Sequence, residues 1–143
     1  MGQAGAGPDR EIPLRRVLIA DDHADTCSLY MEYFEHVGLV VRSAPDAPRA
    51  IACARAFDPD VVITDLSMPG GGGLRVLREL RGDPRTARAL LVVLTASNDD
   101  RLMQRARVAG CDLLITKPSW PGDLLAAVEK AITARTGAEG GGA

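Results

Sequence analysis

The chain has 143 residues, of which 46% are apolar and 25% are charged, a balance typical of one soluble globular domain. Its net charge of −2 and its 3% of aromatic residues argue against a basic nucleic-acid-binding surface and against an aromatic base-stacking platform. Three widely spaced cysteines and the lack of any run of ~20 apolar residues argue against a disulfide framework, a zinc site and a membrane span.

Both ends of the chain are rich in Gly and Ala and carry no hydrophobic pattern. We expect flexible tails over 1–14 and 136–143, because such segments bury too little apolar surface to offset the entropy lost on ordering. The patterned part, 15–135, has no internal linker or repeat, so it is expected to form a single, stand-alone domain. The first residues lack the apolar stretch of a signal peptide, which favours a cytoplasmic protein.

Five short apolar runs predict five β-strands, at Val17–Ala20, Leu39–Arg42, Val61–Thr64, Leu90–Thr95 and Leu113–Thr116. These runs are continuous rather than alternating, which is typical of parallel strands covered on both faces. A stretch with helical spacing follows each run, at about 24–37, after Asp46, after Gly70–Gly73, at about 98–109 and from Pro121. Five β–α units in series predict an α/β fold, a doubly wound parallel sheet with helices on both faces.

Polar side chains follow four of the predicted strands: Asp21 and Asp22, Asp65, Thr95, and Lys117. The carboxyl ends of parallel strands meet at one sheet edge, where ligands bind in such folds. Three clustered carboxylates need a cation, and their oxygen atoms suit Mg²⁺. An ionised Asp can also attack phosphorus to form an acyl phosphate, with a lysine and a hydroxyl to bind the phosphoryl oxygens.

Several of these residues also have a purely structural interpretation. Asp22 could cap the first helix, since a carboxylate after a strand is often a helix N-cap. His23 could ligate a metal, but one isolated histidine is more often a loop residue. Trp120 could contact a partner protein, although packing at the start of the last helix is the more ordinary role.

Four segments resemble the receiver domains of two-component response regulators: VLIADDH (17–23), VVITDLSMPGGGG (61–73), LVVLTAS (91–97) and ITKP (115–118). The resemblance covers about Arg15 to Arg135. It implies a flavodoxin-like (βα)5 fold with five parallel strands in the order 2-1-3-4-5. It also implies a protein that is phosphorylated by a sensor histidine kinase or a histidine phosphotransfer protein, rather than an enzyme acting on a metabolite.

The resemblance assigns a role to each matching residue. Asp65 would accept the phosphoryl group, and Mg²⁺ would be bound by Asp22, by Asp65, by the backbone carbonyl of Ser67 and, through water, by Asp21. Lys117 and Thr95 would bind the phosphoryl group, with the small Ala96 beside them. The output would be contact with an unknown target protein, without nucleic acid or membrane, and the chain would be a monomer or a weak homodimer.

Two positions depart from the family pattern. Leu114 stands where relatives usually carry Tyr or Phe, whose ring moves with the threonine on phosphorylation; we expect Leu114 to stay buried in both states. The run Gly70–Gly73 predicts a loop with unusual backbone freedom.

Three rival functions fit the residues less well. An Asp-nucleophile phosphatase would want an acid at the position of Ser67, and a flavin-binding module would want hydroxyl groups in the loop after the first strand. A receiver-like scaffold that is never phosphorylated would not need the full set of Asp21, Asp22, Asp65, Thr95 and Lys117.

Overall fold

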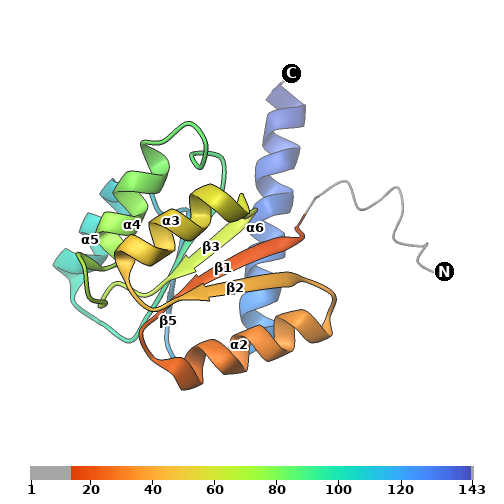
Figure 1. Cartoon of the computed structure of the whole chain (residues 1–143). Coiled ribbons are helices and arrows are strands. Elements are labelled where there is room, and N and C mark those ends of the chain that lie inside the picture. The colour runs from red at the N-terminus through yellow and green to blue at the C-terminus, as the bar shows by residue number, and fades with distance from the viewer. Residues whose placement is uncertain (1–13, 143) are drawn as a thin grey trace.

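The computed structural model describes the backbone of residues 14–142 and the side chains of 14–135 (Figure 1). The elements alternate between strand and helix as predicted: β1 (Arg16–Ala20), α2 (Ala24–His36), β2 (Val40–Ala44), α3 (Ala47–Phe57), β3 (Val61–Thr64), α4 (Gly72–Arg81), β4 (Leu90–Thr95), α5 (Asp100–Ala109), β5 (Leu113–Thr116) and α6 (Pro121–Gly142). Four of the five predicted strands have the observed ends to within one residue, whereas β2 begins one residue and ends two residues later than predicted.

The five strands form one parallel sheet in the order β2-β1-β3-β4-β5. This confirms the predicted flavodoxin-like fold. The chain runs outward from β1 to β2 and then crosses back to β3 on the other side of β1. The carboxyl ends of β1 and β3 therefore flank the point where the strand order reverses, which is the usual ligand position in this architecture.

The core has two layers, one on each face of the sheet. Alternate residues of a strand point to opposite faces, so Leu18 joins the layer beneath α3, α4 and α5, while Val17 and Ile19 join the layer beneath α2 and α6. Leu77 and Phe34, both almost fully buried, close the two layers from the helix side. Leu, Val, Ile and Ala fill most of both layers, as the low aromatic content required.

The two edge strands are less covered than the sequence predicted. All residues of β3 and β4 are buried, but three of five residues in β2 are exposed and no residue of β5 is fully buried. An edge strand has a neighbour on one side only, so its ends extend past the helices that cover the sheet. Continuous apolar sequence did not distinguish these strands from the central ones.

The glycine run adopts the unusual backbone conformations that the sequence predicted, and it is also tightly packed, which the sequence did not predict. Gly70, Gly71 and Gly72 have positive φ angles of 80°, 111° and 71°, and Gly72 and Gly73 already form the first turn of α4. A Cβ atom on Gly73 would lie 2.1 Å from the backbone oxygen of Asp65. The run therefore lets α4 begin directly against the end of β3.

Helix ends show where local signals sufficed. Asp46 caps α3, accepting a hydrogen bond from Arg49 N at 2.8 Å, as predicted.

The last helix departs from prediction, because α6 continues through Thr136 to Gly142 instead of ending at the expected tail. No proline interrupts this segment, and extending a helix costs less than nucleating one. The predicted N-terminal tail lies outside the described residues except for Leu14.

Two smaller findings concern the classes of protein considered above. Within the described residues, no helix combines the length and the apolar character needed to cross a membrane. All three cysteines are free thiols; Cys27 is buried, whereas Cys53 and Cys111 are half-buried.

Candidate functional site

Three charged side chains meet at the carboxyl edge of the sheet. Asp21 follows β1, Asp65 follows β3, and Lys117 follows β5. The Nζ atom of Lys117 lies 2.8 Å from Asp21 Oδ2 and 3.2 Å from Asp65 Oδ2. Both carboxylates are buried, with 5% and 6% of their surface exposed, so one ammonium group bridges two carboxylates at the point where the strand order reverses.

The pairing of Asp21 with Lys117 shifts the protonation equilibria of these two groups toward their charged forms. Burial acts to raise the pKa of Asp21, but hydrogen bonds from Lys117 and from the backbone and ring of His23 outweigh it, so the pKa lies below its ordinary value. Burial acts to lower the pKa of Lys117, and its bonds to the two carboxylates raise it above the ordinary value. The lysine is therefore a fixed positive charge at neutral pH.

The carboxylate of Asp65 is held by two kinds of donor. Its Oδ1 atom accepts hydrogen bonds from the backbone N–H groups of Leu66, at 2.7 Å, and of Ser67, at 3.4 Å. Its Oδ2 atom faces Lys117. The backbone of Asp65 is fixed as well, because its N–H donates to Ala20 O at 2.9 Å and its carbonyl accepts from Thr64 Oγ1 at 2.8 Å. Asp65 is thus oriented before any ligand arrives.

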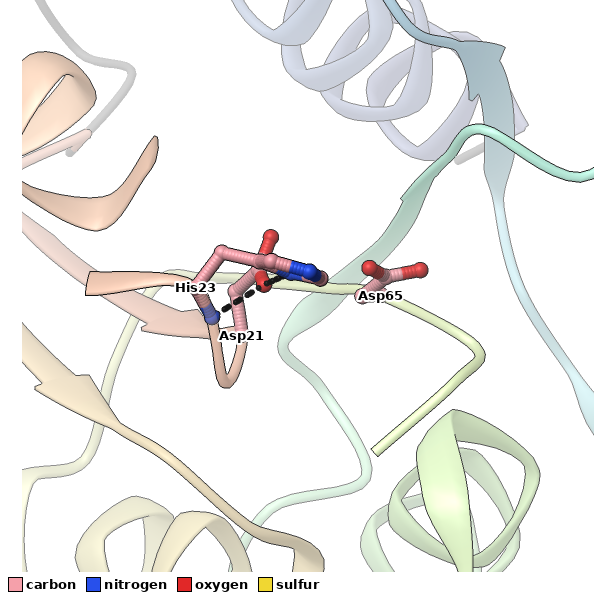
Figure 2. Close-up of side chains that lie close together, drawn as sticks. All are labelled: Asp21, His23 and Asp65. Carbon is pink, nitrogen blue, oxygen red and sulfur yellow. Dashed lines mark hydrogen bonds and ion pairs between the residues drawn. The ribbon is translucent and has the colours of Figure 1, made fainter. Parts of the chain in front are cut away.

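Asp22 and His23 lie at the solvent side of this cluster. His23 is the N-cap residue of α2, so the alternative role of Asp22 as that cap is wrong. The Nδ1 atom of His23 lies 2.9 Å from Asp21 Oδ1 and 3.2 Å from Asp22 Oδ1, and Figure 2 shows its ring against Asp21 with Asp65 nearby.

Sequence reasoning treated His23 as an ordinary loop residue. The structure instead gives Asp21, His23 and Asp65 one potential ligand atom each, all within 4.8 Å of one another. The only sequence signal for this was the adjacency of His23 to the two aspartates. Its ring is 66% exposed, and the hydrogen bond and charge of Asp21 raise the pKa of His23 above its ordinary value.

Thr95 lies between the strands that carry Asp65 and Lys117. Its side chain is buried, its Oγ1 accepts a hydrogen bond from Ser97 N at 3.2 Å, and its carbonyl accepts from Lys117 N at 2.8 Å. The next residue, Ala96, is exposed and adds no bulk beside the site. The loop after β4 is therefore tied to the site through Thr95.

Leu114 is only half-buried, which is less than the sequence predicted. It pairs in register with Val93 of β4 and packs against the core layer beneath α3, α4 and α5. Thr95 is two residues after Val93, so Thr95 and Leu114 lie on the same face of the sheet. The edge position of β5 explains the remaining exposure.

Trp120 faces solvent, so the prediction that it packs at the start of the last helix is wrong. Its side chain is 77% exposed, although its carbonyl accepts the Leu124 N–H in the first turn of α6. The preceding residue is fixed by the hydroxyl of Tyr30 in α2, which donates to Ser119 O at 2.6 Å. A rigid loop thus presents a large apolar side chain three residues after Lys117.

The residues at this edge fit a hard divalent cation. Asp21 and Asp65 together carry two negative charges and Lys117 carries one positive charge, so the buried cluster retains a negative charge even without Asp22. Asp22 adds a third carboxylate, which is 37% exposed. The ring of His23 contacts both this carboxylate and that of Asp21. Ser67, whose backbone carbonyl was the further expected ligand, is exposed directly after this cluster. Carboxylate and carbonyl oxygens are the ligands that Mg²⁺ prefers.

Comparisons with known proteins give a consistent result. Residues 17–129 match the family described as "Response regulator receiver domain". The transcriptional regulatory protein PdtaR of Mycobacterium tuberculosis is 36% identical over 126 residues, covering 87% of this chain and 60% of PdtaR. The chain thus spans less than two thirds of that relative.

Solved structures agree on the fold. The chemotaxis response regulator CheY4 of Vibrio cholerae has a TM-score of 0.76 at 24% identity, covering 82% of this chain and 98% of CheY4. A response regulator from Burkholderia pseudomallei, solved with a phosphorylated aspartic acid, a calcium ion and citrate, has a TM-score of 0.75 at 23% identity, covering 87% of this chain and 72% of that one.

Proposed function

This chain belongs to the family of response regulator receiver domains, the modules of two-component systems that generally accept a phosphoryl group, and we propose that Asp65 is its phosphoacceptor. One observation carries the proposal: the buried Asp65 carboxylate lies at the carboxyl end of β3, 3.2 Å from the Lys117 ammonium group, with Asp21 on the other side of that lysine. A conformationally fixed carboxylate beside a cation is suited to attack phosphorus and to stabilise the product.

The proposed step is an in-line phosphoryl transfer. A carboxylate oxygen of Asp65 forms a bond to phosphorus while the bond from phosphorus to the donor nitrogen or oxygen breaks, and the donor leaves with that electron pair. Lys117 then pairs with a phosphoryl oxygen in place of Asp65 Oδ2. We expect the hydroxyl of Thr95, after rotation of its side chain, and the N–H of Ala96 to donate hydrogen bonds to the phosphoryl group. Both residues lie at the end of β4, the strand next to β3. Hydrolysis of the acyl phosphate returns the carboxylate.

Mg²⁺ is the proposed cofactor, held by Asp22, Asp65 and the Ser67 carbonyl, with Asp21 acting through water. The bound cation would neutralise charge shared between the carboxylates and the phosphoryl oxygens. The negative charge left over in the cluster supports this assignment. The structure of the Burkholderia pseudomallei response regulator contains a phosphorylated aspartic acid and a calcium ion, which supports a divalent cation in a domain of this fold.

The donor is proposed to be a phosphohistidine on a sensor histidine kinase or a phosphotransfer protein, and the output is proposed to be contact with a target protein. We predicted that the chain acts as a stand-alone module. This stays a prediction, because the chain spans only 60% of the length of PdtaR.

The proposed function is tested by incubation with a small phosphodonor such as acetyl phosphate and Mg²⁺, followed by intact-mass measurement. We expect the mass of one phosphoryl group to be added in the presence of Mg²⁺ and no such addition when a chelator is present from the start of the incubation. An unchanged mass under both conditions would contradict the proposed activity.

The metal roles of the two adjacent aspartates predict unequal mutational effects. Asp21 already accepts hydrogen bonds from Lys117 and His23, whereas the carboxylate of Asp22 is open to solvent. We expect Asp22→Ala to weaken Mg²⁺ binding by at least about tenfold, which is about 1.4 kcal/mol, and Asp21→Ala to weaken it less. Titration calorimetry with Mg²⁺ measures both, with the exposed Asp25→Ala as the matched control. Equal or reversed losses would contradict these roles.

The exposed indole of Trp120 predicts an effect that depends on the donor. Large aromatic side chains are common anchors of protein interfaces, and this one stands near Lys117 on a loop fixed by Tyr30. We expect Trp120→Ala to slow transfer from a phosphohistidine-bearing partner protein by about tenfold or more and to leave labelling by acetyl phosphate unchanged. Leu29→Ala, which removes another exposed apolar side chain, is the control. A loss of both reactions would show that Trp120 supports the site instead of a partner.

Leu114 predicts a restricted conformational response. A half-buried leucine gains nothing from moving into solvent, because full exposure would cost up to about 1.5–3 kcal/mol of burial. We expect beryllofluoride with Mg²⁺, a mimic of the acyl phosphate, to change hydrogen exchange mainly at 96–101 and in Gly70–Gly73, with small changes across Leu113–Thr116. A large change centred on Leu114 would show that the leucine itself is the moving element.

A further inference from the structure

A groove of about 480 Å³ separates the exposed sides of α4 and α5, away from the phosphorylation site. It is lined by Arg78, Arg81, Gln104, Arg105, Val108 and Ala109. Two of these side chains come from the last turns of α4, and the others come from the middle and the end of α5. We refer to it as the α4–α5 groove.

The groove concentrates positive charge on a chain whose net charge is −2. Helices α4 and α5 each carry three arginines and one carboxylate, so together they hold six arginines against two acids. Arg78 and Arg105 are exposed, and among the described residues no carboxylate lies within 4.0 Å of either guanidinium group. These two side chains are therefore available to bind an anion.

Arg81 differs from these two because it is committed to the fold. Its Nη2 atom donates to Gly110 O and to Asp112 Oδ2, at 2.5 Å and 2.8 Å, and its Nη1 atom donates to Ala87 O at 2.8 Å. These bonds join α4 to the loop before β5. They fix one wall of the groove relative to the other.

The groove also has an apolar part. Val108 is 79% exposed, the highest value among the large exposed hydrophobic side chains of the described residues. An isolated exposed valine needs no explanation, but this one lies in a concave surface beside two arginines without carboxylate partners. A ligand that fills the groove would bury it.

These features together favour one kind of ligand. Guanidinium groups bind carboxylates with two parallel hydrogen bonds, and Val108 suits an aliphatic side chain. A single-stranded nucleic acid is less suitable, because no aromatic side chain lines the groove to stack a base. We propose that the α4–α5 groove binds an acidic segment of a partner protein, with carboxylates on Arg78 and Arg105 and one aliphatic side chain against Val108.

Both walls of the groove are connected along the chain to residues of the candidate site. Helix α4 begins at Gly72 and Gly73, and the N–H of Gly73 donates to Leu66 O directly after Asp65. Helix α5 begins at Asp100, after the loop that follows Thr95. Phosphorylation should therefore change the spacing of the two walls and the affinity of the groove. This regulation rests on the proposed function, whereas the binding itself does not.

The probe is a short fluorescein-labelled peptide rich in Glu with one central Leu, titrated with the full chain at low salt and followed by fluorescence anisotropy. We expect the double variant Arg78→Glu/Arg105→Glu to bind at least about tenfold more weakly than the wild type. The matched control is Arg49→Glu/Lys130→Glu, which changes net charge equally on other helices and should bind within about twofold of the wild type. Circular dichroism confirms that both variants are folded.

Two further arms test the chemistry of the ligand. Val108→Ser should weaken binding of the Leu peptide but not of a peptide with Ser in place of Leu. The proposal would be overturned if Arg78→Glu/Arg105→Glu bound the peptide as tightly as Arg49→Glu/Lys130→Glu does. It would also be overturned if the wild type bound a single-stranded oligonucleotide more tightly than the peptide.

The last arm separates the groove from the proposed function. Beryllofluoride and Mg²⁺ should shift the peptide affinity of the wild type by at least about twofold. If peptide binding requires Arg78 and Arg105 but does not respond to beryllofluoride, the proposed regulation by phosphorylation is wrong and the proposed docking site is supported. Failure of acetyl phosphate to label the chain would count against the proposed function alone.

Discussion

Asp65→Asn should abolish labelling by acetyl phosphate and Mg²⁺ completely. An amide oxygen is a poor nucleophile toward phosphorus, whereas the ionised carboxylate of Asp65 is already oriented by the N–H groups of Leu66 and Ser67. The variant should stay folded, because the amide oxygen can still accept those hydrogen bonds. Lys117 also keeps an ion-pair partner, since the carboxylate of Asp21 remains beside it. Intact mass measures the labelling, and circular dichroism measures the fold.

The matched control is Asp60→Asn, which makes the same change at the opposite end of the same strand. Asp60 directly precedes β3, as Asp65 directly follows it, and its Oδ2 atom accepts hydrogen bonds from the N–H groups of Arg15 and Arg16. The control should be labelled like the wild type. Labelling of Asp65→Asn at the wild-type rate would show that another side chain accepts the phosphoryl group.

Gly73→Ala should lower both stability and the rate of phosphorylation. The new Cβ would lie 2.1 Å from Asp65 O and 2.9 Å from Leu66 Cα, and both are backbone atoms that cannot rotate away. Forcing an extra carbon into such a contact typically costs about 1–3 kcal/mol, more than the gain of up to about 1 kcal/mol from replacing glycine in a helix. The displaced backbone is that of the phosphoacceptor, so labelling should slow as well. Urea unfolding and intact mass against time measure the two effects.

Gly122→Ala is a close control, since Gly122 is the second residue of α6 as Gly73 is the second residue of α4. Its new Cβ would lie 3.2 Å from the hydroxyl of Tyr33, the far end of a side chain that can move. We expect this variant to keep the stability and labelling of the wild type. Equal effects of the two substitutions would mean that the contact between Gly73 and Asp65 is not what limits either property.

The sequence predicted the features that depend on local pattern. Strand β3 is bounded by Asp60 and Asp65, and a continuous apolar run between two charges leaves little freedom in its ends. The same holds for the N-cap at Asp46, which needs only a carboxylate before a helical segment. The meeting of Asp21, Asp65 and Lys117 then follows from the parallel topology, because the carboxyl ends of parallel strands share an edge.

Other features depend on contacts between segments distant in sequence. The position of His23 against Asp21 depends on the path of the loop after β1, and the exposure of Trp120 depends on how Tyr30 fixes the loop before α6. The packing of Gly73 against Asp65 was missed for the same reason, since four consecutive glycines suggest freedom unless the facing backbone is known. Leu114 is half-buried because β5 is an edge strand, a property of strand order and not of the strand itself.

The most direct test of the central claim locates the phosphoryl group on the wild-type chain. After labelling with acetyl phosphate and Mg²⁺, borohydride reduces an acyl phosphate of aspartate to homoserine, which marks the position permanently for peptide mass spectrometry. We predict that homoserine appears at position 65 and at no other aspartate. Homoserine at position 21 or 22, or a phosphoryl group recovered on His23, would contradict the account.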